Sequence, residues 1–479
     1  MIFNSIPFVL FFVVFFAVYW LSQKKIKLQN GILLAGSYFF YAWWDWRFLL
    51  LLIACTAVSY FLGIKIHSSE GKAKSRWLLA GILIEAGALV YFKYTNFFIQ
   101  SLLDLAQSCH ISLSIHTLRI LLPLGISFYI FRILSYLLDV YYQRVPPERD
   151  TLVYFGYVAF FPSLVSGPID RAKTLMPQLK NKRTFDSGLA ADGTRQILWG
   201  LFKKAVIADN CAMLIDPVFS HSSAYPASTL WLSAFLYTMQ LYADFSGYSD
   251  MAIGIAKLLG FRITRNFQFP FFAQNIADYW RRWHISLTTW LTDFIFTPAS
   301  IRFRNWGNFG LILAIVITFL VSGIWHGANW TFVLWGFLHG CYYIPLILRG
   351  TMHKKRKLPP GILPSRPILI RIFSTFALVL LTNIIFRSAS IAEAFAYYKG
   401  LVNASIVTMP VLQGNMNVFA LLLFVFIMLI IEWLQRDKEF GLQIGDLPKR
   451  AWRWAIYYGI VLLIVFYGTT NTEFIYFQF

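Results

Sequence analysis

The apolar run IPFVLFFVVFFAVYWL, residues 6–21, decides the class of fold to which this chain belongs. It holds no charged side chain, and as a helix it would cover most of the ~30 Å hydrocarbon core of a bilayer. No basic residue precedes it, no small-residue cleavage site follows it, and Lys24, Lys25 and Lys27 come next. We therefore expect a retained membrane span with its N-terminus outside the cytoplasm, not a secretory signal peptide.

Apolar runs of similar length recur along the rest of the chain. Candidate spans lie at residues 30–45, 47–64, 77–93, 118–140, 195–215, 228–248, 309–325, 330–348, 368–386, 416–434 and 451–469. Together with the first run they predict an all-α integral membrane protein with about 10–12 transmembrane helices.

The composition excludes the common soluble classes of protein. Hydrophobic residues make up 58% of the chain and charged residues 13%, against roughly 45–50% and about 25% in soluble domains. So little polar surface could not cover the cores of several soluble domains. A soluble enzyme, a disordered chain and an ordinary nucleic-acid-binding domain are excluded, and we expect no nucleic acid among the partners.

The charge balance indicates how the chain is oriented. Lys and Arg number 42 and Asp and Glu 22, a net charge of +20. In a membrane protein such an excess is typical of loops held on the cytoplasmic side. The basic loops at 22–28, 65–76, 349–366 and 436–453 fall on one side if both termini are external. We therefore expect a multi-pass protein with both termini external.

Two regions do not fit as simple spans. Residues 152–169 are apolar but end in SGPIDR, and residues 250–300 mix short apolar pieces with prolines and many charges. Such segments lie at membrane depth only when they are buried in protein or line a wet cavity. We expect re-entrant or interfacial helices around a central cavity. The chain then forms a single polytopic membrane domain, residues 1–479, with a catalytic core at 160–340.

His326 is the first candidate catalytic residue. It lies in FLVSGIWHGANWTFVLWGFLHG, residues 319–340, where Ser322, Trp325 and Asn329 supply hydrogen-bonding groups. An ionisable residue at membrane depth is costly and indicates function. A desolvated imidazole stays neutral near pH 7 and can accept a proton. The alternative is a histidine that hydrogen-bonds one helix to another.

His284, in NIADYWRRWHISLTTW at residues 275–290, is the second candidate. Helical spacing would place Trp280, His284 and Thr288 on one stripe and would pair Asp278 with Arg282. The alternative is an interfacial amphipathic helix whose tryptophans form an aromatic belt. For His339, 13 residues after His326, the sequence favours a packed or hydrogen-bonded histidine.

The segment QLYADFSGYSDMAIG, residues 240–254, places Asp244 and Asp250 beside Tyr242 and Tyr248. We expect Gly247 to break the helix there. The carboxylates could line a cavity or bind a cation, or Ser249 and Asp250 could cap the next helix. Both interpretations stay open. The chain has no GxSxG, Walker A, HExxH or CxxC motif, and we expect no metal and no bound cofactor.

Several long stretches resemble one known family, in the same order along the chain. They are FFPSLVSGPIDR (160–171), DFSGYSDMAIGIAKLLGF (244–261), NFQFPFFAQNIADYWRRWHISLTTWLTDFIF (266–296), SGIWHGANWTFVLWGFLHG (322–340) and, more weakly, IIFRSASIAEAF (384–395). The chain resembles the membrane-bound O-acyltransferase family, and within it the bacterial branch that contains the alginate O-acetylation membrane protein. The stretch TPASIRFRNWGN (297–308) departs from that branch.

The resemblance implies a membrane O-acyltransferase of the bacterial inner membrane. Such an enzyme would move an acetyl group from a cytosolic thioester, acetyl-CoA, across the membrane for O-acetylation of an envelope or secreted polysaccharide. The catalytic histidines of the family correspond to His326 and His284. A periplasmic acetyltransferase is the implied partner, beside membrane lipid. Residues expected to contact substrate are Asn329, Trp325, Ser322, Trp280, Arg282, Asp244 and Tyr248.

Three alternatives to this function remain at the level of sequence. The chain could be D-alanyl transferase-like, or a peptidoglycan O-acetyltransferase of the same family. It could also belong to a different class, a transporter for a lipid or polysaccharide. The missing internal repeat and the His, Asn and Trp side chains gathered in one short block disfavour a transporter.

Overall fold

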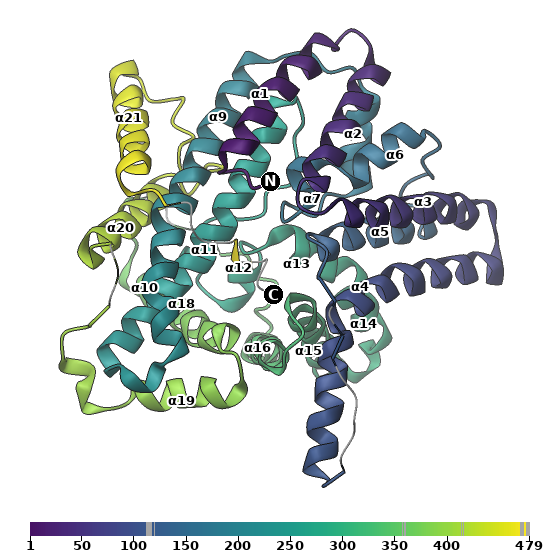
Figure 1. Ribbon diagram of the computed structural model, residues 1–479. Helices are drawn as coiled ribbons and strands as arrows, with labels where there is room; N and C mark the ends of the chain where they lie inside the picture. The colour runs from purple at the N-terminus through teal and green to yellow at the C-terminus, as the bar shows by residue number, and fades with distance from the viewer. Residues whose placement is uncertain are drawn as a thin grey trace. The chain divides into compact units, whose positions relative to one another are not determined.

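The computed structural model describes residues 1–111, 117–118, 120–356, 358, 361–412, 414, 416–469 and 474–475. Within these residues the regular structure is helical throughout, without a strand (Figure 1). The chain divides into two compact units. The first comprises Met1–Gly193 and Ala252–Thr264, and the second comprises Thr194–Met251 and Arg265–Phe479.

The first unit is built mainly from long apolar helices. They are α1 (Ile6–Leu21), α2 (Ile26–Ala42), α3 (Trp46–Ser68), α4 (Gly71–Ser108) and α5 (Ile126–Tyr141), followed by the shorter α6 (Thr151–Val158), α7 (Phe161–Leu164) and α8 (Ala172–Lys180). Helices α3, α4 and α5 pack on one another, and α2 packs on α6. Local caps define where helices begin, since the side chain of Ser5 accepts from Phe8 N and that of Asp45 from Arg47 N.

The segment at 152–169 is broken into short helices, as the sequence predicts. Arg132 on α5 is buried and donates to the backbone carbonyls of Tyr157, Val158 and Ser163 at 3.0–3.1 Å. It also donates to Ser163 Oγ at 2.6 Å. One guanidinium therefore satisfies the carbonyls that a broken helix leaves unpaired, which is the condition for irregular backbone at membrane depth.

The second unit carries the remaining helices. They are the end of α9 (Ser187–Leu201), the π-helix η1 (Phe202–Ala208), α10 (Asp209–Ser220), η2 (Ser222–Ala224), most of α11 (Ala227–Leu258), η3 (Pro270–Phe272), α12 (Ile276–Trp280), α13 (Ile285–Leu291), η4 (Thr292–Phe296), α14 (Thr297–Arg302), η5 (Arg304–Trp306), α15 (Gly307–His326), α16 (Trp330–Cys341), α17 (Ile344–Leu348), α18 (Arg366–Arg387), α19 (Ile391–Leu401), η6 (Ala404–Val407), α20 (Val418–Leu434) and α21 (Arg450–Tyr467). Between 270 and 302 the elements are short, which confirms that part of the irregular region predicted at 250–300, whereas residues 250–258 continue the long helix α11.

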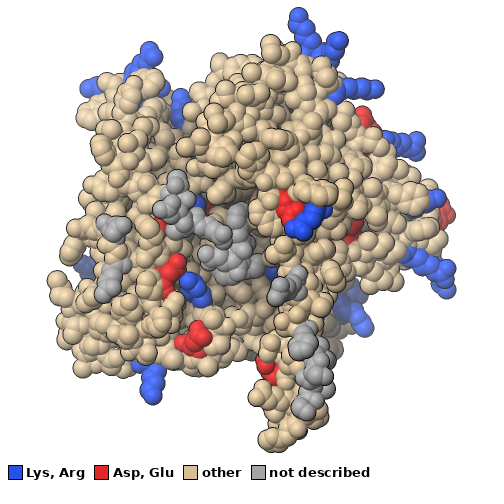
Figure 2. Space-filling view, in the orientation of Figure 1, with Lys and Arg blue, Asp and Glu red and all other residues tan. Residues whose placement is uncertain are grey.

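Several helices have the length and polarity of membrane spans. Among the described residues, five stretches are long and apolar enough to cross a bilayer: Trp46–Ser68, Gly71–Ser108, Arg304–His326, Trp330–Leu348 and Arg366–Arg387. Ile6–Leu21 and Val418–Leu434 are shorter apolar helices. Figure 2 shows a largely uncharged surface with Lys and Arg gathered in a few places. Every predicted span overlaps helical structure, and the all-α membrane fold is confirmed.

The predicted helix break at Gly247 is wrong. Helix α11 runs through Gly247 without interruption, so Ser249 and Asp250 lie inside a helix and cap nothing. A Cβ atom on Gly247 would lie 2.7 Å from the carbonyl oxygen of Gly200. The glycine is therefore needed because it lets two helix backbones approach closely, not because it ends a helix.

Candidate active site

His284 lies at a turn between two short helices, not inside one helix. Its φ of 43° is in the left-handed region, with α12 ending at Trp280 and α13 beginning at Ile285. Asn266 holds the turn, since its carbonyl accepts from Ile285 N at 2.9 Å and its Oδ1 accepts from Ser286 Oγ at 2.9 Å. The predicted single helical stripe through 275–290 is wrong because these tertiary hydrogen bonds replace helical ones.

His326 is the last residue of α15. The chain turns at Gly327, and α16 begins after Asn329, whose side chain accepts from Thr331 N at 3.0 Å. Helices α15 and α16 pack closely because Gly323 faces the carbonyl oxygen of Phe332 with no side chain between. This contact sets the position of His326 relative to α16.

The fold brings the two candidate histidines together. The ring centroids of His284 and His326 are 6.4 Å apart, and the Trp325 ring lies 5.6 Å from His284 and 5.1 Å from His326. His284 is 0% exposed and His326 3%. His284 lies outside the helices that could span a bilayer, and burial lowers the pKa of its imidazole to about 3. The ring is therefore neutral at pH 7, with one nitrogen to donate and one to accept.

A third imidazole, His339, belongs to the same aromatic cluster. Trp280 Nε1 donates to His339 Nδ1 at 3.3 Å. The Trp335 ring lies between the histidines, 4.6 Å from His339 and 5.1 Å from His326 by centroids. Trp280 is a predicted site residue. It contacts His339, which contacts Trp335, and Trp335 in turn contacts His326. Trp335 and His339 are four residues apart and share one face of α16. This spacing is the sequence signal that could have indicated that both belong to the site.

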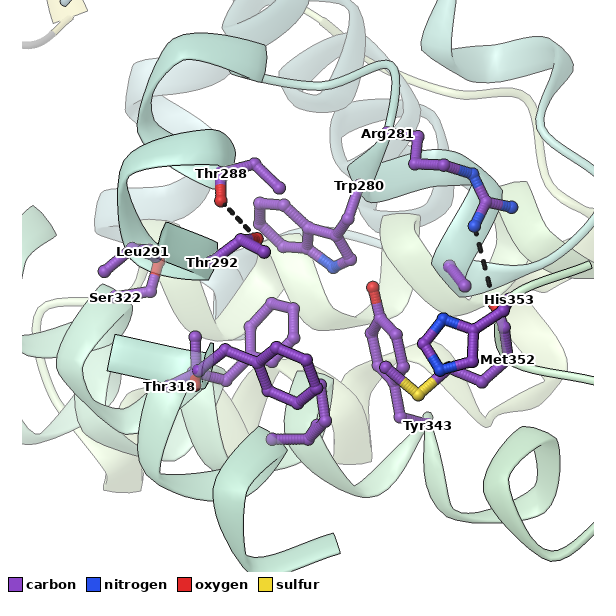
Figure 3. Close-up of a pocket in the computed structure, with 14 residues that line it drawn as sticks. Trp280, Arg281, Thr288, Leu291, Thr292, Thr318, Ser322, Tyr343, Met352 and His353 are labelled. Atoms are coloured by element: carbon purple, nitrogen blue, oxygen red, sulfur yellow. Dashed lines mark hydrogen bonds between the residues drawn. The ribbon is translucent and has the colours of Figure 1, made fainter. Parts of the chain in front are cut away.

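A cavity of about 210 Å³ extends beside this cluster (Figure 3). Figure 3 shows Thr318 and Ser322 at one end, Trp280 and Tyr343 in the middle, and Arg281, Met352 and His353 at the other end. Thr318, Ser322 and His326 follow one another at i,i+4 spacing on α15 and therefore share one face of this helix. The cavity lies along that face, which ends at His326. Arg281 Nη1 donates to Met352 O at 3.4 Å.

Two polar atoms near His326 are available to a ligand. Ser322 Oγ and Trp335 Nε1 are buried with no hydrogen-bond partner among the described residues. A buried polar atom without a partner is costly, by about 1–3 kcal/mol. Both atoms could donate to an oxygen that enters the site.

Arg282 and Asn329, which are predicted to contact substrate, form hydrogen bonds within the protein instead. Arg282 Nε donates to Asp278 at 3.1 Å, which confirms the predicted pair, while the neighbouring Arg281 lines the cavity. Asn329 uses its oxygen to cap α16, and its Nδ2 donates to Ala389 O at 2.8 Å. A direct role for either residue in binding substrate remains a prediction.

Asp244 and Tyr248 lie on α11, in a network of buried charges. Lys204 Nζ is 3.0 Å from Asp244 and 2.7 Å from Asp209. Asp244 Oδ2 also accepts from Ile475 N at 2.8 Å, and the Tyr248 ring lies 4.8 Å from that of Phe474. The carboxylate is therefore engaged by the protein itself. Across the described residues, no group of three or more His, Cys, Asp or Glu side chains could hold a metal ion.

A buried imidazole pair at the end of an apolar helix, beside a narrow cavity, is the candidate active site of this integral membrane protein. The chain belongs to the membrane-bound O-acyltransferase family, whose model matches residues 148–355. It is therefore a multi-pass membrane O-acyltransferase.

Among similar proteins, the probable alginate O-acetylase AlgI of Pseudomonas aeruginosa is 38% identical over 84% of this chain and 75% of its own. The peptidoglycan O-acetyltransferase of Helicobacter pylori is 33% identical over 88% of this chain and 83% of its own. The teichoic acid D-alanyltransferase of Streptococcus thermophilus is 30% identical over 49% of this chain and 58% of its own.

Proposed function

We propose that this protein transfers acetyl groups from acetyl-CoA at the cytoplasmic face across the inner membrane, for O-acetylation of a cell-envelope or secreted polysaccharide. The observation that carries the proposal is the cavity that extends from Arg281 and His353 to Ser322, one helical turn before His326. The names of the relatives support acetyl as the group and a polymer as the acceptor, since two of them are an alginate O-acetylase and a peptidoglycan O-acetyltransferase.

The size of the cavity favours the arm of a thioester. A volume of about 210 Å³ is below the roughly 300–1,000 Å³ of pockets that enclose drug-sized ligands. We expect the acyl end of a narrow acyl-pantetheine chain to enter such a space, while the nucleotide stays outside. Arg281 lies at the end near residues 352–353, on the side predicted to be cytoplasmic, where a guanidinium favours phosphate.

His326 would act as the general base. It takes the proton of the acceptor hydroxyl as that oxygen attacks the thioester carbonyl carbon. The carbon–sulfur bond then breaks, and the thiolate receives the proton from the imidazolium. Ser322 Oγ and Trp335 Nε1, together with the indole of Trp325, are candidates to donate to the developing oxyanion. A base of this kind contributes typically ~10²–10⁴-fold to the rate.

His284 would bind or orient the reacting groups as a neutral ring. The ring centroids of His284 and His326 are 6.4 Å apart, so one bound group could contact both imidazoles. An active site within the membrane does not by itself deliver the acetyl group to a polysaccharide in the periplasm or outside the cell. We therefore include a periplasmic acetyltransferase as the partner that completes the transfer. No resident cofactor is needed for this reaction.

The test measures release of CoA from acetyl-CoA by the purified protein in proteoliposomes. His326→Ala should lower the rate at least ~10²-fold while the protein elutes as a folded species in size exclusion. His221→Ala, which changes an exposed histidine of the same unit, is the matched control and should keep full activity. Unchanged thioester consumption in His326→Ala would overturn the assignment of the base.

The donor assay also separates the alternatives. If neither wild type nor control consumes acetyl-CoA but a D-alanyl thioester is consumed, the acetyl group is the wrong donor. If no thioester is consumed while the protein moves a lipid-linked substrate across vesicles, the protein acts as a transporter.

A further inference from the structure

A second polar cavity lies in the second unit, away from the histidines. Its volume is about 200 Å³, and it is lined by Arg195, Arg450, Arg453, Trp454 and Tyr457. It shares no lining residue with the cavity beside Ser322. The mechanism above uses none of these side chains, so the cavity needs a separate explanation.

The cavity concentrates positive charge that the described protein does not neutralise. Arg453 Nη1 donates to the carbonyl oxygen of Gly445 at 3.0 Å, which orients this guanidinium. Neither Arg195 nor Arg450 forms an ion pair with another described residue. Asp446, next to this site in sequence, is held by Lys438 at 2.6 Å. Three guanidinium groups around one small space attract an anion with several acceptor oxygens.

Tyr457 adds a donor to the same space. Its hydroxyl oxygen is buried and has no hydrogen-bond partner in the part of the chain that is described. A hydroxyl that lines a cavity of arginines would complete the set of donors around a phosphate. The arginines and the hydroxyl therefore point to the same class of ligand.

The helix that carries the cavity also presents an apolar surface. On α21 the side chains that follow Tyr457 are largely exposed: Val461 42%, Leu462 53%, Val465 69% and Phe466 74%. Trp454 stacks on Tyr458 with centroids 5.6 Å apart, and both are exposed, as is typical of the interface between lipid headgroups and acyl chains. In Figure 2, Lys and Arg side chains gather where Figure 1 shows α21.

We propose that this cavity binds the phosphodiester headgroup of an anionic membrane lipid, whose acyl chains lie along the apolar face of α21. Basic pockets on the cytoplasmic side of membrane helices bind such headgroups, and the positive-inside pattern predicts that residues 436–453 are cytoplasmic. The combination of arginines with an adjoining lipid-facing helix surface favours a lipid over a free phosphate or the phosphates of coenzyme A.

The experiment uses the full chain in detergent with phosphatidylglycerol added back, read by thermal unfolding and by native mass spectrometry of retained lipid. Phosphatidylglycerol should raise the Tm of wild type, and phosphatidylcholine should not. Arg195→Gln with Arg450→Gln should weaken phosphatidylglycerol binding at least ~10-fold, the loss of two charge-assisted contacts. Arg453 is left intact because its bond to Gly445 holds the loop.

Arg302→Gln with Arg304→Gln removes the same charge from an exposed segment of the same unit and should leave lipid binding unchanged. Equal loss in both double variants would show a general charge effect and overturn the site. Unchanged binding in the first variant would overturn it as well. If that variant does not fold, Tyr457→Phe replaces it, with a several-fold weaker affinity expected and an unchanged affinity contradicting the proposal.

Two further additions distinguish the source of the phosphate. If inorganic phosphate raises the Tm of wild type as much as phosphatidylglycerol does, the site takes free phosphate and the lipid assignment is wrong. If acetyl-CoA displaces retained phosphatidylglycerol, the cavity belongs to donor binding and the proposal is overturned. If neither competes, the ligand is the lipid headgroup.

Discussion

His284 has a buried ring and a backbone in the left-handed region. Substitutions can distinguish what the ring contributes from what the backbone conformation costs. A residue with a Cβ costs roughly 1–2 kcal/mol in this region, but Asn tolerates it better than most. We expect His284→Ala to be about 1 kcal/mol less stable than His284→Asn, while both lose most acetyl transfer. Thermal unfolding in detergent and CoA release provide the two measurements. Near-normal turnover in His284→Asn would assign His284 a structural role.

The hydrogen bond from Trp280 to His339 predicts a milder effect. Trp280→Phe keeps an aromatic ring beside Phe319 and Trp335 but removes the indole donor. The loss of one such bond costs about 1 kcal/mol, so we expect a slightly lower Tm and a several-fold lower kcat. Trp306→Phe, at an exposed tryptophan, is the control. Equal kinetics in the two variants would show that His339 does not position the site.

At the scale of elements, the packing of α15 on α16 determines where His326 lies. A methyl group on Gly336 would overlap the carbonyl oxygen of Phe319. We expect Gly336→Ala to separate the helices and to destabilise the protein by about 1–3 kcal/mol. The loss of activity should exceed what this destabilisation alone would cause. Gly459→Ala on α21, where a Cβ atom meets nothing within 4 Å, should be neutral or stabilising. Full activity in Gly336→Ala would contradict this account.

The charges that join η1 to α11 give a second prediction at this scale. Lys204→Met would leave Asp209 and Asp244 buried together without their cation, which typically costs 3–5 kcal/mol. Asp244→Asn keeps the Lys204–Asp209 pair at 2.7 Å and should cost only about 1 kcal/mol. The yield of folded protein and the Tm test this order. A loss of activity in Asp244→Asn at unchanged Tm would instead support contact with substrate.

For the whole molecule, the native cysteines test the orientation of the chain. Cys109 is exposed, whereas Cys55 and Cys211 are buried. With both termini external, the segment after the helix at 77–93 lies outside the cytoplasm. A membrane-impermeant maleimide should therefore label intact spheroplasts, and Cys109→Ser should abolish most of that signal. Labelling of Cys109 only after permeabilisation would invert the topology.

The sequence predicts helices well and the site only in part, for one physical reason. Backbone groups in a bilayer must be satisfied within their own segment, so an apolar run of sufficient length can only be a helix. That His326 and Ser322 belong to the same site could be predicted, because they are four residues apart on one such helix. Trp335 was missed because its ring contacts with Trp280 and Phe386, which are distant in sequence, place it in the candidate site.

The sequence by itself determined the membrane class, the helical spans, the irregular core and the two histidines worth testing. Only the tertiary structure decided that His284 and His326, 42 residues apart in the chain, have ring centroids 6.4 Å apart. It also decided that Asn266 would hold His284 in a turn and that Gly247 would lie inside a helix. Local hydrophobicity specifies spans, whereas turns and approaches of this kind depend on hydrogen bonds and backbone contacts between separate elements.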